Sequence, residues 1–109
     1  MGLFSTQKES ECILVFDIGS GSVAGAIVLT SKVHAPRILY AFRSEIPFQE
    51  EATGVRLLSL MLRSLSQVVL ALTHEGFSVA GFGAHRPRIK EALVSLCAPW
   101  VVSKTSLLT

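Results

Sequence analysis

Five residues near the N-terminus have types and a spacing that could bind phosphate and a metal ion: Asp17, Gly19, Ser20, Gly21 and Ser22. Glycine permits a positive φ and lets a ligand approach the backbone without a Cβ atom in the way. Successive N–H groups in such a turn form an anion-binding concavity, to which serine hydroxyls add donors. Asp17 has no basic neighbour in the sequence, and hydrated divalent cations prefer carboxylate ligands. The pattern predicts that residues 19–22 contact phosphate and that Asp17 contacts the metal.

The segments on either side of these residues are expected to be strands that hold the turn in place. Residues 13–16 and 23–29 are apolar runs, and residues 37–46 form a third run bounded by prolines. We expect three consecutive antiparallel strands with the candidate turn between the first two. A plain hairpin with a Gly/Ser-rich turn capped by Asp17 is the structural alternative.

Residues 55–75 show the clearest helical pattern, and Gly76 is the expected stop. Apolar residues recur at helical spacing, and further leucines widen the apolar arc, so we expect a helix that packs on the sheet and is covered on more than one side. A membrane-spanning helix is disfavoured, because Arg56 and Arg63 fall within or beside a run shorter than a bilayer requires. The apolar positions are Leu57, Leu58, Leu60, Met61, Leu62, Leu65, Val68, Val69, Leu70 and Leu72.

The remainder of the chain gives weaker signals. Residues 77–84 are expected to form a loop or a short strand. The basic cluster His85, Arg86, Arg88 and Lys90 lacks interleaved aromatic residues and is expected to be a solvated loop, so no nucleic acid partner is predicted. Residues 88–97 fit either a buried strand or the end of a helix, which periodicity cannot separate. Trp100 is expected to be a packed aromatic residue.

Composition fits one covered α/β layer. The chain has 109 residues, of which 50% are hydrophobic and 17% are charged, with a net charge of +2. Its mean hydropathy is +0.52. One domain at most is expected, with residues 1–10 as a flexible lead-in and residues 11–109 as the folded part. Cys12 and Cys97 are expected to be small buried hydrophobes in a reducing compartment. The three histidines show no zinc-ligand spacing.

Residues 13–29 resemble the first phosphate loop of the actin-like ATPase superfamily, and the Asp-Ile-Gly-Ser form is most similar to the bacterial FtsA and PilM proteins. The resemblance implies a ribonuclease-H-like α/β fold: a three-stranded antiparallel meander, a long helix and a further parallel strand, which favours a strand over residues 88–97. It implies ATP and Mg²⁺ as cofactors, with Asp17 contacting the metal through water and Gly19, Ser20, Gly21 and Ser22 contacting the phosphates.

The resemblance also has limits and wider implications. Many relatives carry a lysine in or just after this turn, whereas here Ser22-Val23-Ala24 occupies that region, which favours binding over hydrolysis. It covers the first subdomain only, so the chain is expected to be a fragment without the second lobe, with weak or no nucleotide affinity by itself. It implies a cytoplasmic protein, at the inner face of the cell membrane, with protein partners in cell division or pilus assembly and with self-assembly.

Two other functions remain open from the residues alone. Metal-dependent nucleases of the Holliday-junction-resolvase type share the ribonuclease-H-like sheet and also begin with a strand that ends in Asp-x-Gly. They need further carboxylates that converge on Asp17 to hold two metals. The other acids are expected at strand ends, in loops or at helix ends, which ranks this function second: Glu45, Glu50, Glu51, Glu75 and Glu91. A non-binding structural remnant is the third possibility.

Overall fold

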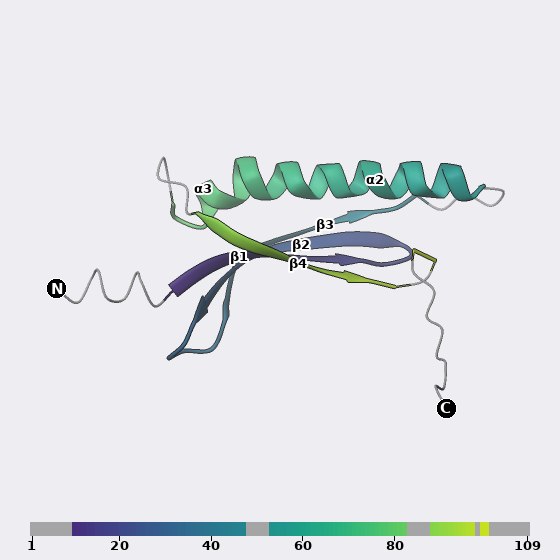
Figure 1. The fold of residues 1–109 in the computed structure, drawn as a ribbon. Coiled ribbons are helices and arrows are strands. Elements are labelled where there is room, and N and C mark those ends of the chain that lie inside the picture. Colours follow the sequence, from purple (N-terminus) through teal and green to yellow (C-terminus); the bar gives the residue numbers. More distant parts are fainter. Residues whose placement is uncertain (1–9, 48–52, 83–87, 98, 101–109) are drawn as a thin grey trace, which may run out of the picture.

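The computed structural model describes residues 10–47, 53–82, 88–97 and 99–100. The predicted lead-in, apart from Ser10, lies outside these residues, as do the acids Glu50 and Glu51 and the basic residues His85 and Arg86. The described part is a mixed α/β domain in which a single helical rod lies against a four-stranded sheet (Figure 1).

The sheet consists of β1 (Ser10–Ile18), β2 (Ser22–Ser31), β3 (Arg37–Glu45) and β4 (Ile89–Leu96) in the order β3-β2-β1-β4. The first three strands form an antiparallel meander, and β4 pairs with β1 in parallel. The three predicted antiparallel strands are confirmed. Residues 89–96 form a strand and not a helix end, so β4 includes Ile89 and Lys90, which the sequence placed in a solvated loop.

The helical rod begins at α2 (Gly54–Leu70), continues through a π-helical segment η1 (Ala71–Gly76) and ends with α3 (Phe77–Val79). The hydroxyl of Thr53 caps it by accepting a hydrogen bond from the backbone N–H of Arg56 at 3.2 Å. The expected stop at Gly76 is wrong, because the rod continues through it. Gly81, with φ of +92°, follows the last helical turn instead and takes the left-handed conformation common after helices.

Gly76 is needed for packing and not for ending the helix. A Cβ atom there would lie 2.8 Å from Tyr40 Cδ2 and 2.9 Å from Ile27 Cδ1. Gly25 in the middle of β2 allows a similar close approach, because a Cβ atom on it would lie 2.5 Å from Val68 Cγ1. These two glycines let the rod lie directly on the sheet, against β2 and β3.

The core lies between the rod and this face of the sheet, and its buried apolar residues come from β1, β2 and the rod, together with Ile46. Side-chain hydrogen bonds add to it: the Ser44 hydroxyl donates to Gln67 Oε1 at 2.7 Å, and the Ser64 hydroxyl donates to Glu45 O at 3.2 Å. The buried hydrophobic cluster comprises Cys12, Phe16, Ile18, Val23, Ile27, Ile46, Leu60, Met61, Val68, Leu72 and Phe77.

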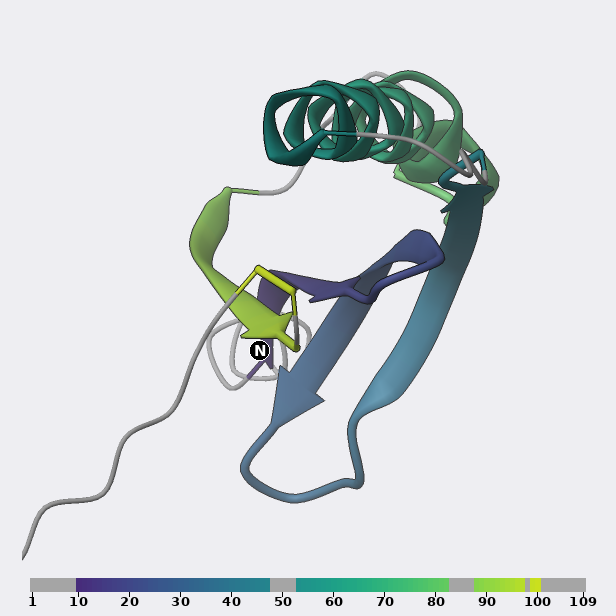
Figure 2. The ribbon, with the colours of Figure 1, turned by 90° about the vertical axis from the view of Figure 1, so that its right-hand side faces the viewer.

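The described helices all lie on one face of the sheet (Figure 2). Within the described residues the rod is covered on one side only, because Leu58, Leu62 and Val69 of α2 stay exposed. The expected cover on more than one side is therefore wrong for this part of the chain. By length and composition the rod, Gly54–Val79, could cross a membrane, with a mean hydropathy of 1.6 in its most apolar stretch, of which 28% is buried. Core helices of soluble proteins meet the same criteria, so this is a weak indication of membrane insertion.

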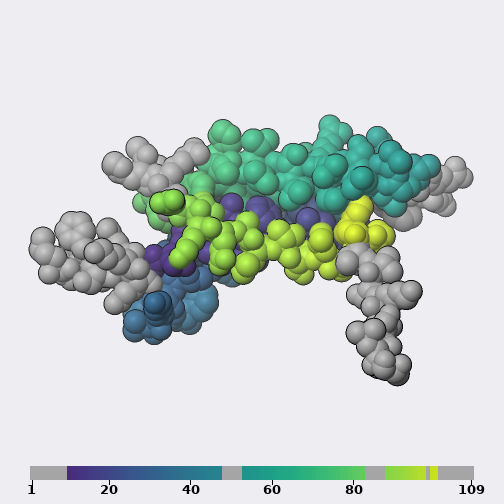
Figure 3. All heavy atoms as spheres, in the orientation of Figure 1, coloured from purple at the N-terminus to yellow at the C-terminus, as the bar shows by residue number. Residues whose placement is uncertain are grey.

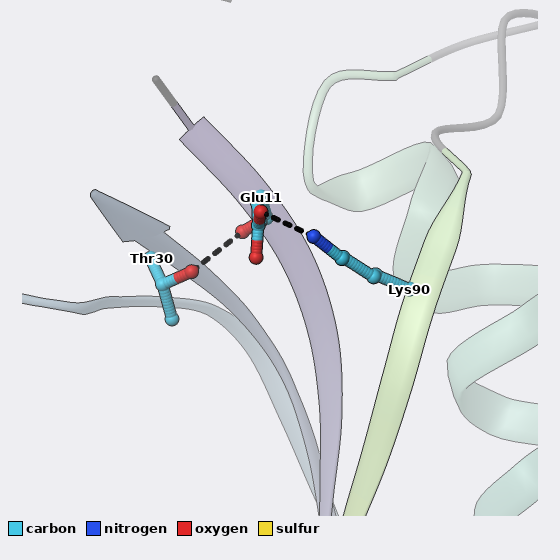
Figure 4. Close-up of polar contacts among 3 residues, drawn as sticks. All are labelled: Glu11, Thr30 and Lys90. Carbon is cyan, nitrogen blue, oxygen red and sulfur yellow. Dashed lines mark hydrogen bonds and ion pairs between the residues drawn. The ribbon is translucent and has the colours of Figure 1, made fainter. Parts of the chain in front are cut away.

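Polar contacts tie three strands together at the start of β1 (Figure 4). Lys90 Nζ lies 2.9 Å from Glu11 Oε1, which joins β4 to β1. The Thr30 hydroxyl donates to the Glu11 carbonyl at 3.2 Å, which joins β2 to β1. The hydrogen bond with Glu11 raises the pKa of Lys90 above its usual value. Both charged side chains are largely exposed, so this pair aligns the strands more than it stabilises them.

Candidate functional site

The candidate turn connects β1 to β2 and is held by two backbone hydrogen bonds. The Gly19 N–H donates to the Ser22 carbonyl at 2.9 Å, and the Ile46 N–H donates to the Gly21 carbonyl at 2.9 Å. The first bond closes the hairpin, and the second fixes the turn to the end of β3. The turn is thus held from two sides by backbone atoms.

The two turn glycines do not use their conformational freedom. Among the described residues only Gly81 has a positive φ, so Gly19 and Gly21 both adopt ordinary backbone conformations. A Cβ atom on Gly19 would lie 3.3 Å from the Ser22 carbonyl, whereas one on Gly21 would meet nothing within 4 Å. Glycine at position 21 therefore leaves open space beside the backbone. This is the access for a ligand that the sequence predicts.

Asp17 is exposed and lies one residue before the end of β1. It is aligned with Ala24 of β2, which is in turn aligned with Arg43 of β3, and it is aligned with Ser95 of β4. Residues opposite each other on neighbouring strands share a face, and successive residues alternate between faces. Gly25 faces the helix, and its neighbour Ala24 therefore faces away from it. The residues aligned with Ala24 face away from the helix as well. Asp17 and Arg43 are therefore on the same surface, about 10 Å apart at their Cα atoms.

A shallow cavity lies between these two charged residues. Its floor is formed by Ala24, Ala26 and Ala41, whose small side chains leave the space open, and Asp17 and Arg43 also line it. Its volume is about 320 Å³. The cavity thus combines an apolar floor with one carboxylate and one guanidinium.

Arg43 is a candidate site residue that the sequence patterns do not reveal. Its Nη1 donates a hydrogen bond of 2.6 Å to the Ser22 hydroxyl, so a cation from β3 reaches the turn. The sequence shows no basic residue next to Asp17 or within the turn, but the pairing of β2 with β3 brings the Arg43 guanidinium to it. The only signal in the sequence is that Arg43 lies near the end of a predicted strand. This position does not reveal that Ser22 is its partner unless the register between the two strands is known.

Trp100 also contacts the turn. Its indole Nε1–H donates to the Gly19 carbonyl at 2.7 Å, and its ring packs against the core, as predicted. The Cys97 N–H donates to the Ile18 carbonyl at 3.3 Å, which brings the end of β4 to the end of β1. Because a trans peptide holds its C=O and N–H on opposite sides, the Gly19–Ser20 peptide turns the N–H of Ser20 away from Trp100. The contact therefore fixes the direction of one of the donors proposed for phosphate.

The two cysteines differ, although the sequence predicts a small buried hydrophobe at both positions. Cys12 is buried, as predicted, and burial raises the pKa of its thiol above its usual value. Cys97 is exposed, so the expectation that it is a buried hydrophobe is wrong. Its Sγ lies 3.7 Å from the Ile18 carbonyl, at the edge of the same region as the turn.

The carboxylates of the described strands do not converge on Asp17. Glu91 lies inside β4, which corrects its expected place outside the strand, and it is aligned with Ile13 on the face that carries Asp17. Four positions along a strand separate Ile13 from Asp17, or about 13 Å, whereas paired catalytic metals lie about 3.5–4 Å apart. In the described ranges no group of three or more His, Cys, Asp and Glu side chains is placed to hold a metal ion.

The residues near the turn can therefore bind an anion together with a cation: backbone N–H groups, the Ser22 hydroxyl and the Arg43 guanidinium for the anion, and the Asp17 carboxylate for the cation. No protein-family model matches the sequence, and no curated protein matches it.

Proposed function

We propose that this chain is the first subdomain of an actin-like ATPase and that the β1–β2 turn binds the phosphates of ATP–Mg²⁺. The observation that carries the proposal is the Arg43–Ser22 hydrogen bond, which brings a positive charge to a turn that already has accessible backbone beside Gly21. A structural hairpin turn has no need of a guanidinium on its hydroxyl. Phosphate oxygens, in contrast, are well suited to charge-assisted hydrogen bonds from arginine.

The fold supports this proposal. An antiparallel meander with β4 added in parallel beside β1, and one helix against β2 and β3, is the arrangement expected for a ribonuclease-H-like subdomain. Asp17 then lies near the carboxyl ends of β1 and β4, which run in the same direction. Ligands of open α/β sheets bind beyond the carboxyl ends of parallel strands.

The residues fit the proposed cofactors by their chemistry. The exposed carboxylate of Asp17 can accept the water ligands of Mg²⁺, which keeps several waters when it binds proteins. Arg43 and the Ser22 hydroxyl hold the phosphate end, and the open space beside Gly21 admits it. The bound Mg²⁺ would supply charge neutralisation of the phosphate oxygens. Because this chain supplies only one wall of the pocket, the function proposed for it is nucleotide binding. The proposed setting is a cytoplasmic assembly of cell division or pilus formation at the inner face of the membrane.

A nucleotide titration followed by amide chemical shifts tests this function, because NMR detects millimolar affinities. Addition of ATP with Mg²⁺ to the ¹⁵N-labelled 109-residue chain should shift the amides of residues 19–22 first. Removal of Mg²⁺ with a chelator should weaken the effect. Asp17→Asn should eliminate the difference between the two conditions, because it removes the carboxylate while it keeps the shape.

Glu91→Gln is the matched control, since Glu91 is an exposed acid on the same face of the sheet at the far end. It should leave both titrations as in the wild type. Shifts spread over the surface without preference for the turn would refute the proposed site, as would an equal Mg²⁺ effect in wild type and Asp17→Asn.

A further inference from the structure

The side of the helical rod turned away from the sheet carries exposed apolar residues. In Figure 3 the atoms of the rod, teal to green, lie along the top of the molecule with the sheet below them. Val68 marks the direction of the sheet, because it is fully buried and a Cβ atom on Gly25 of β2 would meet it. With about 100° between successive residues, Val55 and Leu62 lie about 120–140° from this direction on one side, and Leu70 lies about 160° from it on the other. These three side chains are 81%, 49% and 56% exposed, so the outer surface of the rod is apolar along most of α2.

A row of arginines lies beside these apolar residues. Arg56 and Arg63 are exposed and lie about 120–140° from the direction of the sheet, on the side opposite to Leu62. They are separated by about 10 Å along the helix. Arg56 follows the cap Thr53 in the first turn, where a glutamate or glutamine would complete a capping box and an anion suits the helix dipole. The charge of Arg56 is thus unfavourable for the helix itself, which indicates a contact outside the helix.

The rod has no carboxylate on this outer surface within residues 54–79, all of which the structure describes. Glu75 is the acid of this segment. Its carboxylate accepts a hydrogen bond from the hydroxyl of Tyr40 in β3, so it is turned towards the sheet. The outer surface of the rod therefore combines exposed apolar side chains with positive charge that the rod itself does not neutralise.

Two hydroxyl groups on the outer surface are bonded within the helix. The Ser66 hydroxyl donates to the Leu62 carbonyl at 2.9 Å, and the Thr73 hydroxyl donates to the Val69 carbonyl at 2.8 Å. A buried polar group is costly chiefly when it lacks a hydrogen bond, and serine and threonine in helices can satisfy their hydroxyls in this way. These two residues therefore keep their hydrogen bonds when the outer surface leaves water.

We propose that the outer surface of the rod binds an anionic lipid bilayer, with α2 lying in the plane of the headgroups. A helix in this position buries its apolar residues at the boundary between headgroups and acyl chains, while its arginines extend to the lipid phosphates. A binding site for a protein typically includes aromatic anchors, whereas residues 54–76 contain no Phe, Tyr or Trp. A lipid surface requires only exposed apolar and cationic side chains, and the outer surface of the rod has both.

Contact with a bilayer through the rod leaves the candidate nucleotide site in water. Asp17 and Arg43 face away from the helix, on the opposite side of the sheet. The contact would account for the location proposed at the inner face of the membrane, but it does not rest on ATP binding. A vesicle assay without nucleotide therefore tests the lipid contact separately from the ATP site.

Flotation of the 109-residue chain with vesicles tests the proposal. The wild type should bind vesicles of phosphatidylcholine and phosphatidylglycerol, and it should bind phosphatidylcholine alone much more weakly. Each arginine near an anionic surface strengthens binding about fivefold, so the double variant Arg56→Gln/Arg63→Gln should bind the anionic vesicles about 25-fold more weakly. Lys32→Gln/Arg37→Gln is the matched control, because it removes the same charge from exposed positions around the β2–β3 connection. It should leave binding unchanged.

The apolar row is tested in the same assay. Leu62→Glu should weaken binding at least about tenfold, because it removes a buried leucine and adds a carboxylate. Ile38→Glu is its control, since Ile38 is 70% exposed on β3, away from the rod. Far-UV circular dichroism should show that all variants fold. Equal binding of the wild type to both kinds of vesicle, no binding to either, or undiminished binding of the double arginine variant would overturn the proposal. A wild type that ignores vesicles and dimerises through Leu62 would assign the surface to protein and would also overturn it.

The depth of the helix distinguishes a helix in the plane of the bilayer from one that spans it. In a Cys97→Ser background, an environment-sensitive fluorophore is attached to each of the variants Val55→Cys and Leu70→Cys, while Cys12 is buried. The two positions are about 22 Å apart along the helix. Lipids brominated near the headgroups should quench both probes equally. Quenching that shows the two probes at widely different depths would indicate a spanning helix and would contradict the proposed contact.

Discussion

Replacement of Gly25 by alanine should destabilise the domain by about 1–2 kcal/mol. The new Cβ atom would lie 2.5 Å from Val68 Cγ1 and 3.0 Å from Leu72 Cδ1. Carbon atoms in contact lie about 3.5–4.0 Å apart, so one of the groups must move by about 1 Å. Val68 is fully buried, and a β-branched side chain in a helix has one strongly preferred rotamer, so it has little freedom to move aside. Overpacking of this kind typically lowers the free energy of unfolding by about 1–3 kcal/mol. About 0.4–1 kcal/mol of this loss is offset, because alanine lowers the conformational entropy of the unfolded chain relative to glycine.

Urea unfolding followed by circular dichroism measures the effect. With an m value of about 1–3 kcal/mol/M, the midpoint should fall by roughly 0.3–2 M. Gly21→Ala in the same hairpin is the control and should stay within about 0.5 kcal/mol of the wild type, because nothing lies near its new methyl group. Val68→Ala should restore part of the loss when combined with Gly25→Ala, since it removes the atom that clashes. Equal midpoints for Gly25→Ala and the wild type, or strict additivity in the double variant, would refute the close helix–sheet approach.

Three further changes probe the site and its surroundings. Gly21→Ala should weaken ATP binding while it leaves stability unchanged, since its methyl group would fill the open space beside the turn; an unchanged dissociation constant would show that the ligand does not approach there. Arg43→Gln should weaken ATP binding about tenfold or more, as expected for the loss of a hydrogen bond to a charged group, and Arg37→Gln at the other end of β3 should not. Ellman's reagent should modify the exposed Cys97 quickly and Cys12 only on unfolding, because Cys12 is buried and burial also raises the pKa of its thiol; equal rates would contradict this.

The three antiparallel strands were predictable because they follow from local pattern, whereas the place of β4 beside β1 was not. Apolar runs interrupted by small residues or prolines gave the three antiparallel strands, and the family resemblance favoured a strand over residues 88–97. The end of the helix was not predictable. Gly76 has the residue type of a helix stop, but its lack of a side chain serves contact with Tyr40 and Ile27, which is a tertiary contact that no window of sequence contains.

The candidate site was predictable in its position but not in its composition. Asp17 and the turn residues lie together because they are adjacent in the chain. The contacts of Arg43 and Trp100 with the turn join residues 21 and 81 positions apart, and they depend on strand register and on the path of the chain after β4. Likewise Cys97 belongs to an apolar run, yet it lies just beyond the end of an edge strand and is exposed.

The hydrogen bond from Trp100 to Gly19 gives this protein a built-in optical reporter. Trp100 is the only tryptophan in the chain, so its emission is not mixed with that of another indole. Its Nε1–H is bonded to the carbonyl of the turn itself, and indole fluorescence responds to the polarity and hydrogen bonding of its surroundings. Binding of the proposed ATP ligand at the turn should therefore change the emission of the native protein, which can be measured without a label and without a change to the sequence.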